Sequence, residues 1–242
     1  MTDGALAGQT VVLIGGSAGI GLETARLALA EGAKVVLTGR NEERLEKSVA
    51  EIGAQGSAAF DANDPAAVAK FFEDLPSPID HILITAGGPA YGAMLDMTAA
   101  EISEALSGHI VVALEVARHA APKMRPGGAL VLMGGTGGRK ISRALGIASA
   151  ATAALPPFAA ALALELAPIR VNLIAAGFVD TPLSASLLGD DLDARRTELS
   201  ERLPIGRVVG PGDVAALAVH LMTNTALTGA TYDIDGGQQF VF

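Results

Sequence analysis

Short apolar runs alternate along the chain with longer stretches of helical length. Each short run has the length and composition of a buried β-strand. Seven runs are predicted as strands: Thr10–Ile14, Lys34–Thr38, Ser57–Phe60, Asp80–Ile84, Gly128–Met133, Ile169–Ala175 and Thr231–Ile234. This regular alternation predicts an α/β fold, in which a doubly wound parallel sheet carries helices on both faces.

Several predicted helices are preceded by residues that suit a helix start. Asn41 can accept a hydrogen bond from the N–H groups of the next turn. Asp64–Pro65 and Thr181–Pro182 each place a capping residue before a proline, whose missing N–H costs nothing at the first helical position. Thr98–Glu101 has the pattern of a capping box. Since no linker, repeat or low-complexity tract separates these elements, residues 1–242 are predicted to form a single domain.

The composition fits such a domain and excludes some functions. Of the 242 residues, 50% are hydrophobic and 4% aromatic, and the abundant Ala and Gly allow helices to pack closely on a buried sheet. The formal net charge of −9 and the lack of a basic run argue against a nucleic-acid partner. The chain has no cysteine, which excludes disulfides and thiol chemistry, and we expect no metal site.

The first residues and the most apolar segment bear on where the protein resides. Residues 1–4 contain no basic region that leads into an apolar stretch, so no secretion signal is expected. The apolar segment 144–168 is interrupted by Pro156 and Pro157, and we do not expect it to span a membrane. The sequence therefore predicts a cytoplasmic protein without a membrane partner.

A glycine-rich loop joins the first predicted strand to a helix expected to begin near Leu22. In segment 14–21, Gly15 permits the tight turn, Gly19 lets the backbone approach a diphosphate, and Gly21 allows helix and strand to pack closely. The N–H groups and the dipole at the helix start favour an anion. A plain strand–helix turn has a similar composition, but the position between a buried strand and an amphipathic helix favours dinucleotide binding.

This loop resembles the Thr-Gly-x-x-x-Gly-x-Gly motif of short-chain dehydrogenases/reductases, with Ile14 in place of Thr. Other segments resemble that family's motifs in order: Asp61, Thr85–Gly87, Arg170–Asn172 with Gly177–Pro182, Pro204–Arg207 and Asp235–Gly237. The resemblance spans nearly the whole chain and implies a Rossmann-type fold with a seven-stranded parallel sheet. It further implies cofactor binding by Gly15, Ser17, Gly19, Ile20, Gly21, Asp61, Ala86, Gly87 and Thr181.

The end of the second strand bears on which dinucleotide is bound. An NAD-selective site places a carboxylate there, whereas an arginine suits the 2′-phosphate of NADP. The strand ends Leu37–Gly39 without an acid, and Arg40 follows at once. Alternatively, Arg40 is a solvated residue paired with Glu43 or Glu46. We favour the phosphate role and expect NADP(H) to bind in preference to NAD(H).

The chain lacks the Asn, Ser, Tyr and Lys that form the family's catalytic set. Neither Tyr91 nor Tyr232 has a lysine four residues later, and the last lysine is Lys140. Counting from neighbouring motifs places the four roles at His109, Gly135, Ala148 and Thr152. In the family, the Lys lowers the pKa of the Tyr and holds the nicotinamide ribose, which neither Ala nor Thr can do. Hydride transfer to a carbonyl still needs a proton for the developing alkoxide.

His109 and three other side chains are candidates for supplying that proton or stabilising the alkoxide, and each also has an ordinary structural role. His109 titrates near neutral pH, or else fills the Asn space as a buried, hydrogen-bonded histidine. Tyr91, on the loop after the fourth strand, donates a proton or forms an aromatic lid. Thr136 and Ser149 donate hydrogen bonds to the alkoxide, or serve only as polar loop or cap residues.

Two further features affect the shape of the predicted pocket. Arg139 and Lys140 follow the fifth strand, and either point into the pocket or are solvated loop charges. Pro156–Pro157 interrupts the next helix, since an interior proline removes a hydrogen bond and clashes with the preceding turn. The helix is therefore expected to begin near Leu155, with residues 141–154 rearranged or kinked; a kinked but otherwise ordinary helix is the alternative.

Two functions remain open from the sequence. The first is an NADP(H)-dependent oxidoreductase of short-chain dehydrogenase type, acting on an unidentified small carbonyl or alcohol with an unusual or substrate-assisted proton donor. The second is a catalytically inactive NADP(H)-binding sensor or structural partner subunit. The family resemblance favours the oxidoreductase, although sites decide function. The apolar faces around 99–121 and 156–167 and the apolar end 240–242 predict a homo-oligomer, for which the resemblance implies a tetramer.

Overall fold

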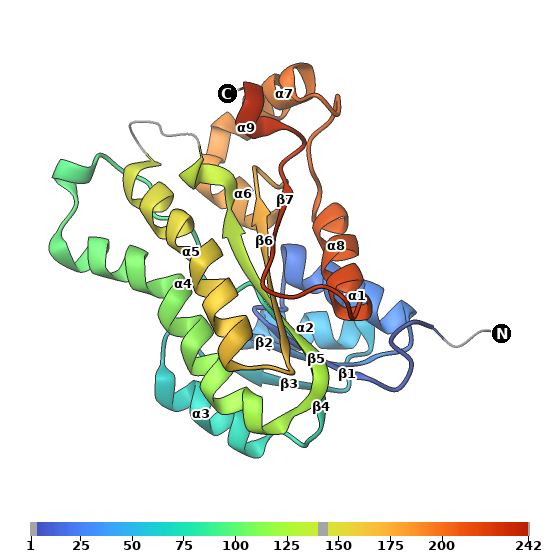
Figure 1. The fold of residues 1–242 in the computed structure, drawn as a ribbon. Helices are drawn as coiled ribbons and strands as arrows, with labels where there is room; N and C mark the ends of the chain where they lie inside the picture. The colour runs from blue at the N-terminus through green and yellow to red at the C-terminus, as the bar shows by residue number, and fades with distance from the viewer. Residues whose placement is uncertain (1–3, 140–144, 242) are drawn as a thin grey trace.

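The computed structural model describes residues 4–139 and 145–241 and is built around a twisted parallel sheet (Figure 1). Its seven strands lie in the order β3-β2-β1-β4-β5-β6-β7. They are β1 (Thr10–Ile14), β2 (Lys34–Gly39), β3 (Gly56–Ala59), β4 (Ile79–Ile84), β5 (Met124–Gly135), β6 (Arg170–Ala176) and β7 (Thr231–Ile234). The predicted fold class and all seven predicted strands are confirmed. The largest difference is in β5, which extends beyond the predicted Gly128–Met133 at both ends.

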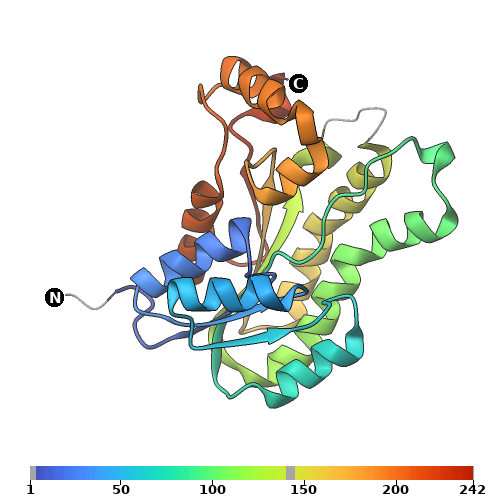
Figure 2. The same cartoon turned by 180° about the vertical axis from the view of Figure 1, so that it is seen from behind.

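Helices cover both faces of the sheet (Figures 1 and 2). One face carries α3 (Pro65–Asp74), α4 (Ala99–Ala120) and α5 (Gly146–Glu165). The other carries α1 (Gly19–Ala30), α2 (Glu42–Ile52) and α8 (Pro211–Thr223). Beyond the carboxyl ends of the strands lie α6 (Pro182–Leu188), α7 (Leu192–Arg202) and α9 (Gln238–Val241). The 3-10 turns are η1 (Met94–Asp96), η2 (Ala121–Lys123), η3 (Thr136–Gly138) and η5 (Gly189–Asp191).

The predicted helix caps are present. The side chains of Asn41, Asp64 and Thr181 each accept a hydrogen bond from a backbone N–H in the first turn of their helix. Thr98 and Glu101 form the reciprocal pair of a capping box at the start of α4. Each such cap stabilises the protein by about 1 kcal/mol. These contacts were predictable because a cap depends on residues within one turn of each other.

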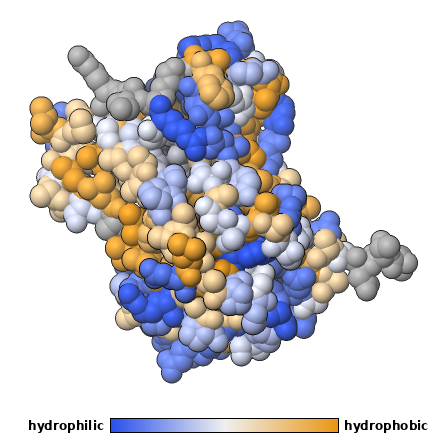
Figure 3. All heavy atoms as spheres, viewed as in Figure 1, coloured by the Kyte–Doolittle hydropathy of each residue, from blue (hydrophilic) through white to orange (hydrophobic). Residues whose placement is uncertain are grey.

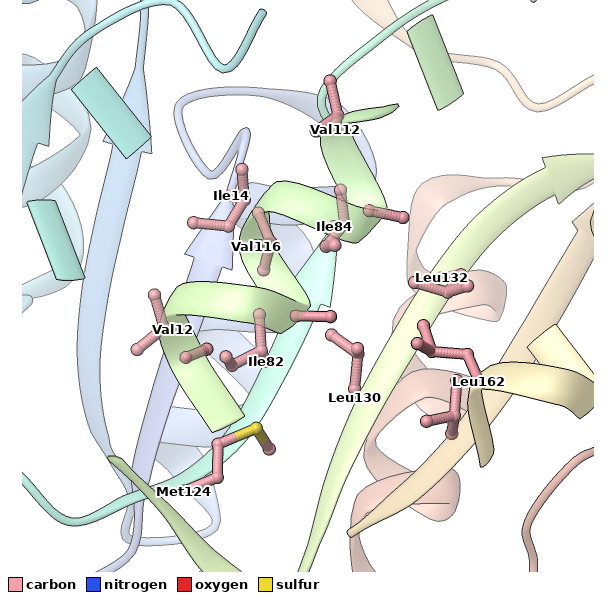
Figure 4. Packing of buried hydrophobic residues seen from close by; sticks show 14 of the residues in the cluster. Val12, Ile14, Ile82, Ile84, Val112, Val116, Met124, Leu130, Leu132 and Leu162 are labelled. Atoms are coloured by element: carbon pink, nitrogen blue, oxygen red, sulfur yellow. The ribbon is translucent and has the colours of Figure 1, made fainter. Parts of the chain in front are cut away.

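The strands contribute side chains to an apolar core on each face. Successive residues of a strand point to opposite faces, so Val12 and Ile14 of β1 join one core while Val11 and Leu13 join the other. Figure 4 shows the first core, where side chains of α4 and α5 meet those of the central strands: Val112, Val116, Leu162, Ile82, Ile84, Leu130 and Leu132. Burying one such side chain contributes about 1.5–3 kcal/mol. Burial on both faces explains why the strands read as continuous apolar runs.

The expected start of α5 near Leu155 is wrong. The helix begins at Gly146 and continues through Pro156 and Pro157. Its sheet-facing residues are buried on both sides of the proline pair: Ala151, Leu155, Ala159 and Leu162. Their burial compensates for the roughly 3 kcal/mol that an interior proline costs. Residues 141–144 of the segment expected to rearrange lie outside the described residues.

The proline pair also fails to divide the most apolar segment of the chain. In the described residues, α5 is the one helix long and apolar enough to cross a membrane by length and composition. The expectation that Pro156 and Pro157 interrupt this segment is therefore wrong. A core helix passes the same test, and the buried side chains of α5, such as Leu155, pack against the sheet.

The direction of the chain reverses between the two central strands. From β1 the chain builds outward to β3, and from β4 it builds the other way to β7. The helices that follow these two strands along the chain, α1 after β1 and α4 after β4, therefore pack on opposite faces of the sheet. Ligands of doubly wound sheets bind at this point.

Candidate functional site

Two glycines allow the loop after β1 to pack against the loop after β4. Gly15 has φ +100°, and a Cβ there would lie 2.7 Å from Oγ1 of Thr85 and 2.8 Å from the backbone N of Ala86. A Cβ at Gly21 would lie 2.4 Å from the carbonyl oxygen of Gly15. The Thr85 hydroxyl donates a hydrogen bond of 2.8 Å to that same oxygen. Larger residues at either position would separate the two loops.

The start of α1 lacks a side-chain cap. The helix begins at Gly19, earlier than the predicted Leu22, and its N-cap residue Ala18 makes no side-chain hydrogen bond to the first turn. Gly19 has φ +54°, and a Cβ there would meet Thr181 at 3.4 Å. The first N–H groups of a helix have no partner within the helix. This helix start is therefore suited to an anion.

The end of β2 is a glycine packed against Ser17. A Cβ at Gly39 would lie 2.8 Å from Oγ of Ser17, which is buried. Arg40 is exposed, and no ion pair among the described residues joins it to Glu43 or Glu46. The alternative in which Arg40 pairs with one of these acids is therefore not found.

Asp61 lies after β3 at the same edge of the sheet and is exposed. Its Oδ1 accepts hydrogen bonds of 3.0 Å from the backbone N and from the side-chain amide of Asn63. These contacts fix the carboxylate of Asp61 at the surface, close to the end of β2. Its contact with an adenine ring stays a prediction.

A cavity of about 740 Å³ opens beside the glycine loop. Its walls come from the loops after β4, β5 and β6 and from helices α4 to α7 and α9. Seven predicted site residues line it: Ile20, Ala86, Gly87, Tyr91, His109, Thr136 and Thr181. The other predicted residues do not line it: Gly15, Ser17, Gly19, Gly21, Arg40 and Asp61. The predicted site residues are thus divided between this cavity and the adjoining edge at β1, β2 and β3.

His109 lies on α4 and reaches the cavity wall beside the loop after β4. A Cβ at Gly87 would be 3.5 Å from Nδ1 of His109, an ordinary van der Waals distance, which places the imidazole directly beside this loop. Burial lowers the pKa of His109 below its ordinary range. The ring has no hydrogen-bond partner among the described residues, in contrast to the expected alternative of a hydrogen-bonded histidine. A neutral imidazole therefore faces the cavity.

Tyr91 stands at the cavity mouth, on the loop between β4 and η1. Its side chain is 53% exposed. Partial burial raises the pKa of the Tyr91 phenol, and the positive charge of Arg195 opposes this rise. The phenol is therefore protonated at neutral pH and can donate a hydrogen bond.

The hydroxyl groups on the α5 wall are directed to the backbone. The Ser149 hydroxyl donates to the carbonyl oxygen of Gly137 at 2.8 Å. The Thr152 hydroxyl donates to the carbonyl oxygens of Ala148 at 2.9 Å and Ser149 at 3.2 Å. Of the hydroxyl candidates that we considered, this leaves Thr136, which is buried in the cavity wall and forms no side-chain hydrogen bond among the described residues.

The loop after β5 carries one described charge. Arg139 forms an ion pair with Asp233 of β7 and a hydrogen bond of 3.5 Å with Gln239. Arg139 does not line the cavity, so it does not point into the pocket. Because it is ion-paired, it is not a free solvated charge either. Lys140 lies outside the described residues.

Several cavity residues were not identified from the sequence. They come from the segment after β6 and from the C-terminal end: Phe178, Leu183, Leu187, Leu188, Arg195, Gln238 and Gln239. Their only signal in the sequence was that they belong to segments beside the expected pocket. No motif shows which face of α6 or α7 points into the cavity. No group of His, Cys, Asp or Glu in the described part of the chain is arranged to hold a metal ion.

Comparison with known proteins agrees with this architecture. A family model described as enoyl-(acyl carrier protein) reductase matches residues 15–239. The chain is 31% identical to the NADP-dependent (R)-specific alcohol dehydrogenase of Lentilactobacillus kefiri over 98% of each chain. A small-chain dehydrogenase solved in complex with NADPH superimposes with a TM-score of 0.82 and 28% identity, covering 96% of this chain and 99% of that one. A short-chain oxidoreductase from Pseudomonas aeruginosa PAO1, described as containing an atypical catalytic center, gives a TM-score of 0.85 and 25% identity over 95% of this chain and 96% of its own.

Proposed function

Because the chain belongs to the short-chain dehydrogenase/reductase family of oxidoreductases, we propose that it is an NADP(H)-dependent enzyme with a non-standard set of proton-transferring residues. Its reaction is the interconversion of a small carbonyl compound and the corresponding alcohol. The observation that carries this proposal is the cavity beside the uncapped start of α1, which His109, Tyr91 and Thr136 all line. These are protic groups beside the place where a dinucleotide fits.

The residues present fit NADP(H). The uncapped N-terminus of α1 suits the diphosphate, since its N–H groups point outward from a loop in which Gly15 and Gly19 have positive φ. The exposed Arg40 suits the 2′-phosphate, and Gly39 stands at the end of β2 where an NAD-selective site has an acid. The chemistry that NADP(H) supplies when bound is hydride transfer. The NADP dependence of relatives supports this choice of cofactor.

Proton transfer is assigned to side chains of the cavity. Alcohol oxidation needs a group that accepts a proton, and the neutral imidazole of His109 does so. Carbonyl reduction needs a donor to the developing alkoxide, for which His109 is the first candidate and Tyr91 the second. Thr136 has a hydroxyl suited to a hydrogen bond with the alkoxide. Ala148 and Thr152 take no part, since one is an alkyl group and the other donates to the backbone.

Oxidation of NADPH by a panel of ketones and aldehydes tests this proposal, with wild type compared with the His109→Ala, Tyr91→Phe double variant. We expect turnover with a subset of the panel and a loss of roughly 10²–10⁴-fold in the variant. Full activity in the variant would remove both residues from proton transfer. NADPH binding measured by calorimetry is the control, and should be unchanged.

A second candidate is a catalytically inactive NADP(H)-binding sensor or partner subunit. The observation that favours it is the α5 wall, where Ala148 carries no acid and the hydroxyls of Ser149 and Thr152 are directed to the backbone. Tight NADPH binding without turnover across the whole panel would support this function over the first.

A further inference from the structure

Arg195 is the one charged side chain that lines the cavity in the described part of the chain. No carboxylate lines the cavity there, although the protein as a whole has a net charge of −9. The titratable groups His109 and Tyr91 are both uncharged at neutral pH, because burial lowers the pKa of the first and raises that of the second. Arg195 is therefore the one charged group that the described cavity lining offers to a ligand.

Ion pairs hold this guanidinium at the cavity. Arg195 donates from NH1 to Oε2 of Glu198 at 2.6 Å, and its side chain is 27% exposed. Glu198 also accepts from Arg202 at 3.1 Å, so Arg195 shares this carboxylate with a second arginine of α7. The next residue, Arg196, binds Asp180 in a bidentate pair of 2.9 and 2.8 Å, which fixes α7 to the segment after β6.

Tyr91 lies near this charge on a different wall. It belongs to the loop after β4, whereas Arg195 belongs to α7, and the charge of Arg195 acts on the phenol. A guanidinium and a phenol O–H both donate hydrogen bonds, and neither suits a cation. Both groups line the same cavity from different elements, and each can donate hydrogen bonds to an anion there.

The rest of this part of the cavity is apolar. Leu183, Leu187 and Leu188 of α6 and Phe178 line it. A ligand held by Arg195 would therefore place an apolar body against these side chains. The glycine loop contributes only Ile20 to the lining, so this part of the cavity lies beyond the segment suited to the cofactor diphosphate.

We propose, on the basis of the proposed oxidoreductase function, that the substrate is a carbonyl compound with an apolar body and a carboxylate. Arg195 and Tyr91 bind the carboxylate, and proton transfer then falls to His109, the first candidate. Arg195 is then the residue that determines specificity for acids over neutral carbonyl compounds. A guanidinium paired with a carboxylate forms stronger hydrogen bonds than neutral groups do. An ester or amide of the same shape would lose this interaction.

The test uses 4-oxo-4-phenylbutanoate and the amide of the same acid, added to the full-length protein saturated with NADPH. We expect calorimetry to give a dissociation constant at least about ten-fold lower for the acid. Equal constants, or no binding of the acid at millimolar concentration, would overturn the proposal. Oxidation of NADPH is recorded separately, so that acid-selective binding without turnover would count against the oxidoreductase function and not against the anion site.

Variants of Arg195, Tyr91 and Arg202 show which side chains cause the preference for the acid. Arg195→Gln is expected to abolish the preference for the acid, Arg195→Lys to retain part of it, and Tyr91→Phe to reduce it. The matched control is Arg202→Gln, which also removes a partner of Glu198 but does not line the cavity. An equal loss of acid preference in Arg202→Gln would contradict the assignment. So would an Arg195→Gln variant that keeps the acid preference but binds NADPH more weakly, because that result would assign Arg195 to a cofactor phosphate.

Discussion

The choice between two dinucleotides depends on adjacent residues at the end of β2. Arg40→Ala is expected to weaken NADPH binding by roughly 1.5–3 kcal/mol, because it removes a charge-assisted contact to the 2′-phosphate. NADH binding should not change, since NADH has no such phosphate. Calorimetry with both cofactors measures this, and Arg44→Ala, an exposed arginine one turn away, is the control. Unchanged NADPH affinity in Arg40→Ala would contradict the assigned role.

His109 should make the rate depend on pH below the ordinary imidazole range. Burial lowers the pKa of His109, so the neutral base dominates at pH 7. Alcohol oxidation should rise as pH increases through this lowered pKa and then level off, while carbonyl reduction through His109 should fall over the same interval. The profile of kcat/KM against pH records the break. The same break in His109→Ala would assign it to another group.

A second histidine should make stability sensitive to acid. His81 is 4% exposed; its Nδ1 accepts from the backbone N of Ala129, and its Nε2 is 2.6 Å from Oε1 of Gln9. Burial, followed by the charge of Arg170, lowers its pKa to about 4. The unfolded chain binds a proton near the ordinary value of about 6.5, so stability is lost as pH falls from about 6.5 to about 4, by up to about 3 kcal/mol.

His81→Asn removes this titration. We expect the variant to be less stable than wild type at pH 7, because it loses buried contacts, but to lose less further stability between pH 7 and pH 4.5. Urea unfolding at the two pH values measures both effects. An identical pH dependence in wild type and variant would show that other groups cause the acid sensitivity.

At the level of whole elements, α5 shows where sequence reasoning reaches its limit. The strands and caps were predictable because neighbouring residues determine them. The start of α5 was not, because contacts with distant strands hold it: a Cβ at Gly134 would lie 2.7 Å from Cδ1 of Leu155 and 3.2 Å from Cδ1 of Leu173. For the same reason, the sequence placed His109 and Tyr91 near a pocket but did not identify Arg195, whose orientation depends on how α7 packs.

Two substitutions on α5 should have opposite effects on stability. Leu155→Ala should lower the free energy of unfolding by roughly 2–5 kcal/mol, because Leu155 is fully buried. Pro157→Ala should raise it, since an exposed interior position regains a helical N–H, although greater freedom of the unfolded chain offsets part of the gain. Chemical denaturation measures both. Destabilisation by Pro157→Ala would show that the prolines are needed for packing.

At the scale of the whole molecule, an apolar surface on α4 and α5 supports self-association. Leu106, Val111 and Leu114 of α4 and Leu164 of α5 are exposed, and Leu164 is 83% accessible. Figure 3 shows hydrophobic residues along the side where Figure 1 places these helices. Large exposed apolar patches usually mark interaction sites. We therefore propose a homo-oligomer, with the tetramer expected from the sequence as its state.

Light scattering measures the mass, and Leu164→Glu should shift it toward smaller species because a charge cannot be buried without a partner. Phe240→Glu tests the C-terminal end separately, since Phe240 is 79% exposed on α9. A wild-type monomer at micromolar concentration would refute the expectation. Dissociation by Phe240→Glu alone would place the contact at α9.

The uncapped start of α1 also concerns folding. A helix whose first N–H groups lack a side-chain partner at Ala18 is incomplete until an anion occupies that position. A ligand that binds only the folded chain adds RT ln(1 + [L]/Kd) to its stability. On the proposed function, the amount of folded protein would then follow the concentration of its dinucleotide. The same helix end would bind the cofactor for the reaction and would also make the lifetime of the chain depend on the nucleotide pool around it.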